Sequence, residues 1–133
     1  MNIPAENLIP HRPPMCFIHA LTHCDDASTH ATARFNADDF AVSNHLVLEA
    51  ALVECVAQTI AASLAHSCRG DNPPALGMLA AVTDFQILAR PAAGENLKIE
   101  VRERKRLGPM RLISGTIICD GQLIASGELT VYA

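Results

Sequence analysis

The chain has 133 residues, of which 50% are hydrophobic and 4% aromatic, and its formal net charge is −4. This length is typical of one domain with a sufficient buried core, so we expect residues 1–133 to form a single domain. The absence of Trp, the scarcity of aromatic rings and the negative charge exclude the stacking platforms and basic surfaces that bind nucleic acid.

The sequence does not have the patterns of an exported or membrane-bound protein. Prolines and polar residues interrupt residues 1–15, where a secretory signal would have an apolar region. The most apolar stretch, 46–64, carries Glu49, Glu54 and Gln58, which are costly in hydrocarbon, and therefore predicts a core helix rather than a membrane span. The five cysteines are odd in number and form no Cys-x-x-Cys pair, so we expect reduced thiols in a cytoplasmic protein.

The N-terminal part of the chain predicts two strands followed by a loop. Residues 15–26 are rich in short apolar side chains and follow a proline-rich turn at 10–14 that prevents a helix just before them. Residues 28–35 alternate small and polar side chains and predict a second strand. Residues 36–45 are polar and irregular, which indicates a loop.

Residues 47–66 predict one long helix, because apolar side chains recur on nearly every face and neither Gly nor Pro interrupts them. The Gly and the two prolines of residues 69–74 predict its end. Four further strands are predicted at residues 76–90, 97–107, 110–119 and 123–132. Asp120-Gly121 indicates a two-residue hairpin, and we expect the four strands to form a meander.

Two strands, one helix and four strands predict an α+β hotdog fold, in which an antiparallel sheet of about six strands wraps around one long central helix. The helix is apolar around its circumference, and one sheet cannot cover all of it. We therefore expect a homodimer in which the two sheets join edge to edge.

Several segments resemble the bacterial 3-hydroxyacyl-acyl-carrier-protein dehydratases. Leu-Ile-Pro-His-Arg-Pro-Pro-Met, from residue 8, is similar to the family's Leu-Pro-His-Arg-x-Pro-Phe opening. Glu-Cys-Val-Ala-Gln at 54–58 resembles the family's Glu-Ala-Met-Ala-Gln, and the run from 94 to 121 resembles its C-terminal strands. The resemblance implies a hotdog protein that acts on 3-hydroxyacyl thioesters held by acyl carrier protein or by coenzyme A.

The family's His-Phe-Pro-Gly motif is missing from this chain. Its His lies fourteen residues before the helical Glu, and that position is Phe40 here. The chain therefore resembles a divergent branch that keeps the opening and the helix and has lost the His motif. Either His45 replaces the missing His, or the chain has lost its own chemistry.

Dehydration of a 3-hydroxyacyl thioester requires a base, an acid for the leaving oxygen and donors at the carbonyl. We expect Glu54 to be the acid, because burial in an apolar helix would raise its pKa and keep it protonated. His45 is the imidazole nearest in sequence and is the candidate base. The alternatives are a buried structural Glu satisfied by Gln58 and an ordinary loop His.

Two groups of residues are candidates for binding the substrate and its carrier. The first helical amides lack partners within a helix, so the backbone of Glu49, Ala50 and Ala51 could hold the thioester oxygen, and Gln58 lies one turn after Glu54. A carrier-docking stripe is predicted from Arg102, Arg104 and Arg106, which alternate on one face of a strand, and from Arg111 on the next strand. The alternative is a charged edge that prevents aggregation.

We expect no metal site and no cofactor. His19 and His23 share one face of the predicted strand while Cys24 points to the other, so the three side chains do not converge as ligands. His11 and Arg12 are expected to brace the N-terminal turn. Histidines on a strand are usually structural.

The residues leave three functions open. The first is a dehydratase-like lyase in fatty-acid or polyene-type biosynthesis. The second is an acyl-thioester hydrolase, because Asn44-His45 followed by a helical carboxylate loosely resembles hotdog thioesterases. The third is a non-catalytic subunit of a heterodimer with a second hotdog subunit, which the Phe at position 40 favours.

Overall fold

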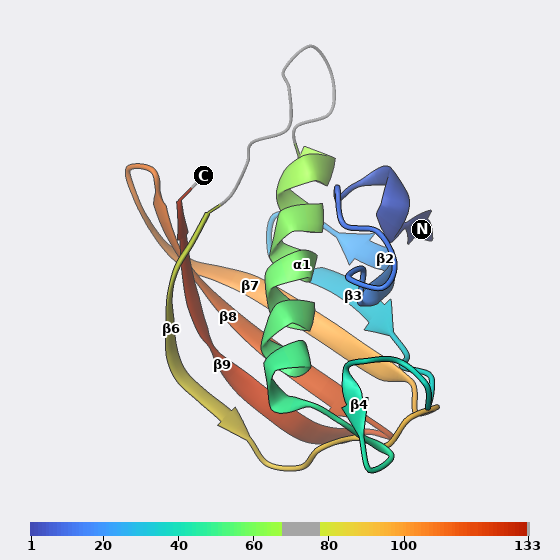
Figure 1. The fold of residues 1–133 in the computed structure, drawn as a ribbon. Coiled ribbons are helices and arrows are strands. Elements are labelled where there is room, and N and C mark those ends of the chain that lie inside the picture. Colours follow the sequence, from blue (N-terminus) through green and yellow to red (C-terminus); the bar gives the residue numbers. More distant parts are fainter. Residues whose placement is uncertain (68–77, 133) are drawn as a thin grey trace.

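The computed structural model describes residues 1–67 and 78–132. The N-terminal elements are β1 (Ile3–Pro4), a short 3-10 helix (Ala5–Asn7), β2 (Ile18–Cys24), β3 (Thr29–Ala33), β4 (Val42–Ser43) and β5 (Leu46–Val47). They are followed by α1 (Glu49–Ser67), β6 (Met78–Ile87), β7 (Leu97–Leu107), β8 (Met110–Cys119) and β9 (Gln122–Tyr132). Figure 1 shows α1 running along the inner side of one curved sheet.

The sheet is antiparallel and has the strand order β1-β2-β3-β7-β8-β9-β6. A single helix enclosed by one antiparallel sheet is the predicted α+β hotdog fold (Figure 1). The sheet has seven strands rather than six, because β1 pairs with β2. Two residues are too few to show an alternating pattern, so the sequence did not reveal this strand.

The predicted loop at 36–45 contains a small hairpin. β4 pairs with β5 across a two-residue turn in which Asn44 and His45 have φ values of 54° and 66°. Positive φ at both central positions defines a type I′ turn, which matches the twist of the paired strands. Because Leu46 and Val47 belong to this hairpin, the helix begins at Glu49, two residues later than predicted. The predicted helix end at 69–74 lies outside the described residues.

The predicted four-strand meander is wrong. β7, β8 and β9 follow one another as neighbours, but β6 pairs with β9, and β7 pairs with β3. The tight turns after β7 and β8 force those strands to pair with their successors. Residues 88–96 form a longer connection, which allows the chain to cross from one edge of the sheet to its middle.

The core lies between α1 and the sheet. Leu52, Cys55, Val56 and Thr59 of the helix are fully buried. The sheet comes very close to the helix at Gly115, where an added Cβ would lie 2.5 Å from Cγ1 of Val56. None of the described residues belongs to a helix that is long and apolar enough to cross a membrane.

One side of α1 is only partly covered within the chain. Glu54, Ala57 and Ala61 lie on this side and are half-buried. The edge strand β6 lies nearby, and its Met78 and Leu79 are 71% and 46% exposed to solvent. The part of the helix that one sheet leaves open is therefore the part that carries the candidate acid.

Candidate active site

The opening turn of the chain brings a histidine to the helix. The guanidinium of Arg12 donates hydrogen bonds to the carbonyl oxygens of Ile9, His11 and Glu6 at 2.9, 2.7 and 3.1 Å. These bonds confirm that Arg12 braces the N-terminal turn. They hold the backbone on both sides of Pro10, and the turn presents the side chain of His11 to α1.

His11 and Glu54 face each other. Nε2 of His11 lies 3.6 Å from Oε1 of Glu54, and the two side chains are 32% and 37% exposed. Nδ1 of His11 is buried and has no hydrogen-bond partner among the described residues. Nε2 is therefore the ring nitrogen that can exchange a proton with a ligand beside Glu54.

Glu54 is less buried than the sequence predicted. The expectation of a raised pKa relied on a carboxyl enclosed by an apolar helix, whereas 37% of this side chain is accessible in the single chain. A partner subunit on the open side of α1 would supply the missing burial. The chemistry of Glu54 therefore depends on what covers this side of the helix.

Gln58 connects Glu54 to the opening segment. Its Nε2 donates to Oε1 of Glu54 at 3.1 Å and to the carbonyl of Met15 at 2.8 Å, while its Oε1 accepts from the amides of Phe17 and Ile18 at 2.8 and 3.3 Å. These four bonds use both amide hydrogens and both lone pairs of the side chain. Gln58 is 1% exposed, so its side chain orients Glu54 and has no capacity left for the substrate-binding role predicted from sequence.

His11, Glu54 and Gln58 border a cavity of about 190 Å³. Its remaining lining is apolar and comes from α1, β6 and β9: Ala57, Ile60, Ala61, Leu64, Leu79 and Val131. A polar pair at one end of an apolar cavity suits a ligand with a reactive polar group and a hydrocarbon chain.

His45, the base predicted from sequence, lies elsewhere in the fold. It occupies the β4–β5 turn, is exposed, and its carbonyl accepts a hydrogen bond from the amide of Ala93 at 2.9 Å. It does not line the cavity at Glu54. The sequence signal for His11 was the Pro-His-Arg opening itself, which we interpreted only as a brace, because His11 lies far from the helix along the chain.

The predicted amide donors at the start of α1 are only partly available. The amide of Ala51 donates to the carbonyl of Leu48 at 3.1 Å, so it is already engaged. Glu49 and Ala50 are exposed, and they remain the candidates for holding a carbonyl oxygen at this end of the helix.

The sequence predicted that the arginines form one stripe, but in the structure they lie on two faces of the sheet. A β-bulge at Arg104 places Glu103 opposite Ile113 and Lys105 opposite Leu112, so the alternation of side chains reverses there. Arg106 therefore pairs with Arg111 on the side of the sheet that faces the helix. The side chain of Arg102 lies on the outer face, where its Nε donates to Glu100 at 2.6 Å.

The described residues include one group with three possible metal ligands close together, Glu95, Cys119 and Asp120. Sγ of Cys119 donates to Oε2 of Glu95 at 3.0 Å. Burial and the neighbouring Glu95 raise the pKa of Cys119 to about 12, so its sulfur is a protonated thiol at neutral pH in the metal-free protein. His23 pairs with Asp25, with Nε2 and Oδ2 2.9 Å apart, and Cys24 contacts Ser63.

Comparison with known proteins assigns the chain to a family. The model of the ApeP-like family, described as ApeP dehydratase, matches residues 3–133. The chain belongs to the ApeP-like dehydratase family. The match confirms the resemblance to a dehydratase family that the sequence predicted. A search of curated proteins finds no significant match to the sequence.

Solved structures confirm the hotdog fold of this ApeP-like protein. The dehydratase heterocomplex ApeI:P from Xenorhabdus doucetiae contains a chain that matches with a TM-score of 0.86 and 20% identity, covering 98% of this chain and 90% of that one. The PaaI protein of the Escherichia coli phenylacetic acid degradation operon matches with a TM-score of 0.71 and 12% identity, with coverage of 85% and 81%. A hypothetical thioesterase with coenzyme A from Streptococcus pneumoniae matches with a TM-score of 0.69 and 12% identity, with coverage of 84% and 82%.

Proposed function

We propose that this ApeP-like protein removes water from 3-hydroxyacyl thioesters carried by acyl carrier protein, giving 2-enoyl thioesters in fatty-acid or polyene-type biosynthesis. The observation that carries the proposal is the 3.6 Å approach of His11 Nε2 to Glu54 Oε1 at the end of an apolar cavity. Membership of a dehydratase family supports the reaction type.

The pair fits the two proton transfers of the reaction. Nε2 of His11 takes the proton from the carbon beside the thioester carbonyl, and the electron pair of that C–H bond forms the new double bond. Glu54 gives a proton to the hydroxyl group on the next carbon, so the C–O bond breaks and water leaves. The proton gained by His11 then passes to Glu54 across the short gap between them, which restores both groups.

The predicted roles of the neighbouring residues follow from this assignment. The hydrogen bond from Gln58 fixes Oε1 of Glu54 and leaves Oε2 for the leaving hydroxyl. The amides of Glu49 and Ala50 are the remaining candidates for the thioester oxygen. Arg102 and Arg104 stay exposed on β7, where they are available to steer an acidic carrier protein.

The architecture also supports a second hotdog subunit, either another copy of this chain or a different protein. β6 is a ten-residue edge strand whose first seven residues are all exposed, including Met78, Leu79 and Val82. Exposed apolar edges of this length are usually paired in soluble proteins. Pairing there would cover Leu79, which lines the cavity at Glu54.

A heterodimer is the second candidate arrangement. The ApeI:P structure is described as a heterocomplex, and Phe40 replaces the His that complete dehydratases carry in this position. In that arrangement the partner would supply a catalytic His, and this chain would contribute Glu54. The hotdog thioesterase structures leave hydrolysis as a further outcome of the same assay.

The test is incubation of the purified chain with a 3-hydroxyacyl carrier protein, followed by mass analysis of the carrier. Loss of water supports the proposal, and loss of the acyl group indicates a hydrolase. Glu54→Gln and His11→Ala are each expected to lower dehydration about 10²–10⁴-fold, the usual contribution of a positioned acid or base. His45→Ala is the matched control and is expected to remain active.

Three results would change the assignment. If His45→Ala is inactive and His11→Ala is active, His45 is the base. If the isolated chain is inert and gains activity only with a second hotdog protein that carries an intact His, this chain is a partner subunit. If Glu54→Gln remains fully active in every combination, Glu54 is not part of the dehydration machinery.

A further inference from the structure

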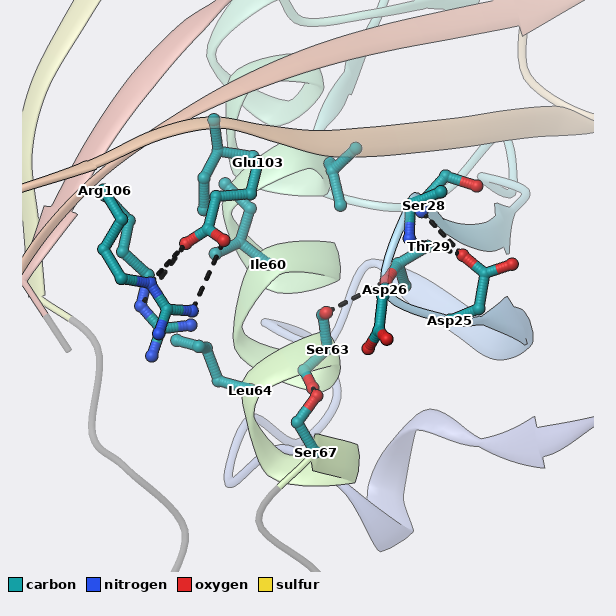
Figure 2. Close-up of a pocket in the computed structure, with 14 residues that line it drawn as sticks. Asp25, Asp26, Ser28, Thr29, Ile60, Ser63, Leu64, Ser67, Glu103 and Arg106 are labelled. Atoms are coloured by element: carbon teal, nitrogen blue, oxygen red, sulfur yellow. Dashed lines mark hydrogen bonds and ion pairs between the residues drawn. The ribbon is translucent and has the colours of Figure 1, made fainter.

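A second cavity lies next to the one at Glu54, and the two share Ile60 and Leu64 in their linings. Its volume is about 130 Å³, and it is enclosed by the β2–β3 turn, the second half of α1 and the strands β7 and β8. Figure 2 shows Leu64 between Arg106 on one side and Ser63 on the other. Its lining combines apolar side chains, among them Ile60, Leu64 and Ile113, with charged side chains of both signs.

Strand register connects the two cavities directly. Arg106 pairs with Arg111, Arg111 with Val131, and Val131 with Leu79, so these four side chains form one row on the helix-facing side of the sheet. Val131 and Leu79 line the cavity at Glu54, whereas Arg106 and Arg111 line the second cavity. Neighbouring strands are about 4.8 Å apart, so Arg111 lies only one strand away from the wall of the Glu54 site.

The two arginines share one carboxylate. Nε and Nη2 of Arg106 lie 3.1 and 3.3 Å from the two oxygens of Glu103, and Nε of Arg111 lies 3.7 Å from Oε1 of Glu103. The group therefore keeps a net charge of +1. Arg111 is the less accessible of the two, with 23% of its side chain exposed, and its Nη atoms have no hydrogen-bond partner among the described residues. Those donors are available to an anion in the cavity.

We propose that Arg106 and Arg111 bind the phosphate of a phosphopantetheine arm, which then runs over Leu64 and Ile60 and delivers its thioester to Glu54. The assignment of the thioester to Glu54 rests on the proposed function. The helix rises about 15 Å from Glu54 to Leu64, a distance that the arm covers when it is nearly extended. Guanidinium groups bind phosphate through paired, charge-assisted hydrogen bonds.

The other walls of the cavity favour the same placement. Asp25 and Asp26 lie on the β2–β3 turn, across Ser63 from the arginines (Figure 2). Oδ1 of Asp25 already accepts hydrogen bonds from the amides of Ala27 and Ser28 at 2.7 and 2.8 Å. Both carboxylates repel a phosphate, so an anion is confined to the arginine side, which is also the side that adjoins Val131.

The experiment measures binding of 4′-phosphopantetheine and of pantetheine, which lacks the phosphate, to the full chain by calorimetry. Wild type is expected to bind the phosphorylated compound about 10–100-fold more tightly, the range of one or two charge-assisted hydrogen bonds. Arg111→Gln and Arg106→Gln are each expected to remove most of this preference without weakening pantetheine. Arg111→Lys, which keeps the charge, is expected to retain part of it.

Arg102→Gln is the matched control. Arg102 and Arg106 lie on the same strand, are 52% and 54% exposed, and each pairs with one Glu, but Arg102 is on the outer face. The control is expected to keep the full preference for the phosphorylated compound. Binding of coenzyme A and of holo-carrier protein, which both carry the phosphopantetheine arm, is measured in the same way. The one whose binding depends on Arg111 is the source of the phosphate. Apo-carrier, which has no arm, is expected to be insensitive to Arg111→Gln.

The proposal is overturned if wild type binds both compounds equally, if Arg102→Gln loses as much as Arg111→Gln, or if Arg111→Gln weakens pantetheine to the same extent. Failure of the proposed function gives a different result. In that case the arginine-dependent phosphate preference persists, but neither wild type nor a mixture with a hotdog partner dehydrates a 3-hydroxyacyl thioester. Conversely, dehydration of carrier-bound substrate at an unchanged KM in Arg111→Gln leaves the proposed function intact and removes the phosphate site.

Discussion

Replacing Gln58 by Leu removes the side chain that connects the carboxyl of Glu54 to the opening segment. The amides of Phe17 and Ile18 are buried and would lose their shared acceptor, Oε1 of Gln58. The carbonyl of Met15 lies at a more exposed position and can bond to water instead. Each buried group left without a partner costs about 1–3 kcal/mol, so the loss for these two amides is expected to lower the free energy of unfolding by about 2–6 kcal/mol. Urea unfolding of the purified chain measures this change.

The same substitution also separates positioning from folding. Glu54 loses the donor to its Oε1, so dehydration by the folded fraction is expected to fall through kcat. Little change in KM is expected, because all the hydrogen-bonding groups of Gln58 are used within the chain and none is left for the substrate. Gln58→Glu keeps the shape but replaces the amide donor by a second carboxylate beside Glu54, and it is expected to lower kcat as well. Gln122→Leu, at an exposed position after the β8–β9 turn, is the control. A loss of stability below 1 kcal/mol for Gln58→Leu, or an unchanged kcat, would refute this reasoning.

Three further predictions follow from other parts of the fold. Gly127→Ala is expected to destabilise the protein by about 1–3 kcal/mol in thermal or urea unfolding. The added Cβ would lie 2.7 Å from Cα of Phe85, and a backbone atom cannot easily move to relieve this clash. Hydrogen bonds from turn amides lower the pKa of Asp25 in the folded protein, so its ionised form stabilises the fold at a pH above the unfolded pKa. Wild type is therefore expected to be more stable than Asp25→Asn at neutral pH. This difference in the free energy of unfolding is expected to disappear as the pH falls through the lowered folded pKa. Cys119, with a pKa raised to about 12 by burial and Glu95, is expected to resist alkylation at neutral pH, and Glu95→Gln is expected to shift its labelling profile to lower pH.

The sequence was most reliable where local chemistry decides the structure. The helix lacks Gly and Pro from residue 49 to 67, and the tight turns after β7 and β8 fix strands whose bounds, 97–107 and 110–119, were predicted exactly. Positive φ at Asp120 and Gly121 confirms the predicted two-residue hairpin. These features depend on residues that are close together in the chain.

The candidate site could be predicted only in part. The position of Glu54 follows from the helix motif, since a single helical residue is placed by its own element. The histidine that faces Glu54 could not be found by choosing the one nearest to it in the sequence. Arg12 anchors the opening turn and Gln58 binds the segment after it, and together they bring His11 to the helix from far away in the chain, whereas His45 is only close in sequence.

By itself, the sequence determined the α+β hotdog class, the central helix and the dehydratase likeness, because hydrophobic period, turn residues and short motifs are local properties. Only the tertiary structure decided which strands are neighbours, which histidine meets Glu54 and which arginines face the helix. The bulge at Arg104 illustrates the physical reason. One extra residue in β7 moves every later side chain of the strand to the opposite face of the sheet, and the composition of the strand does not predict this change. Arg106 and Arg111 therefore lie on the helix-facing side of the sheet and line the cavity next to the one at Glu54, instead of lying on the outer surface.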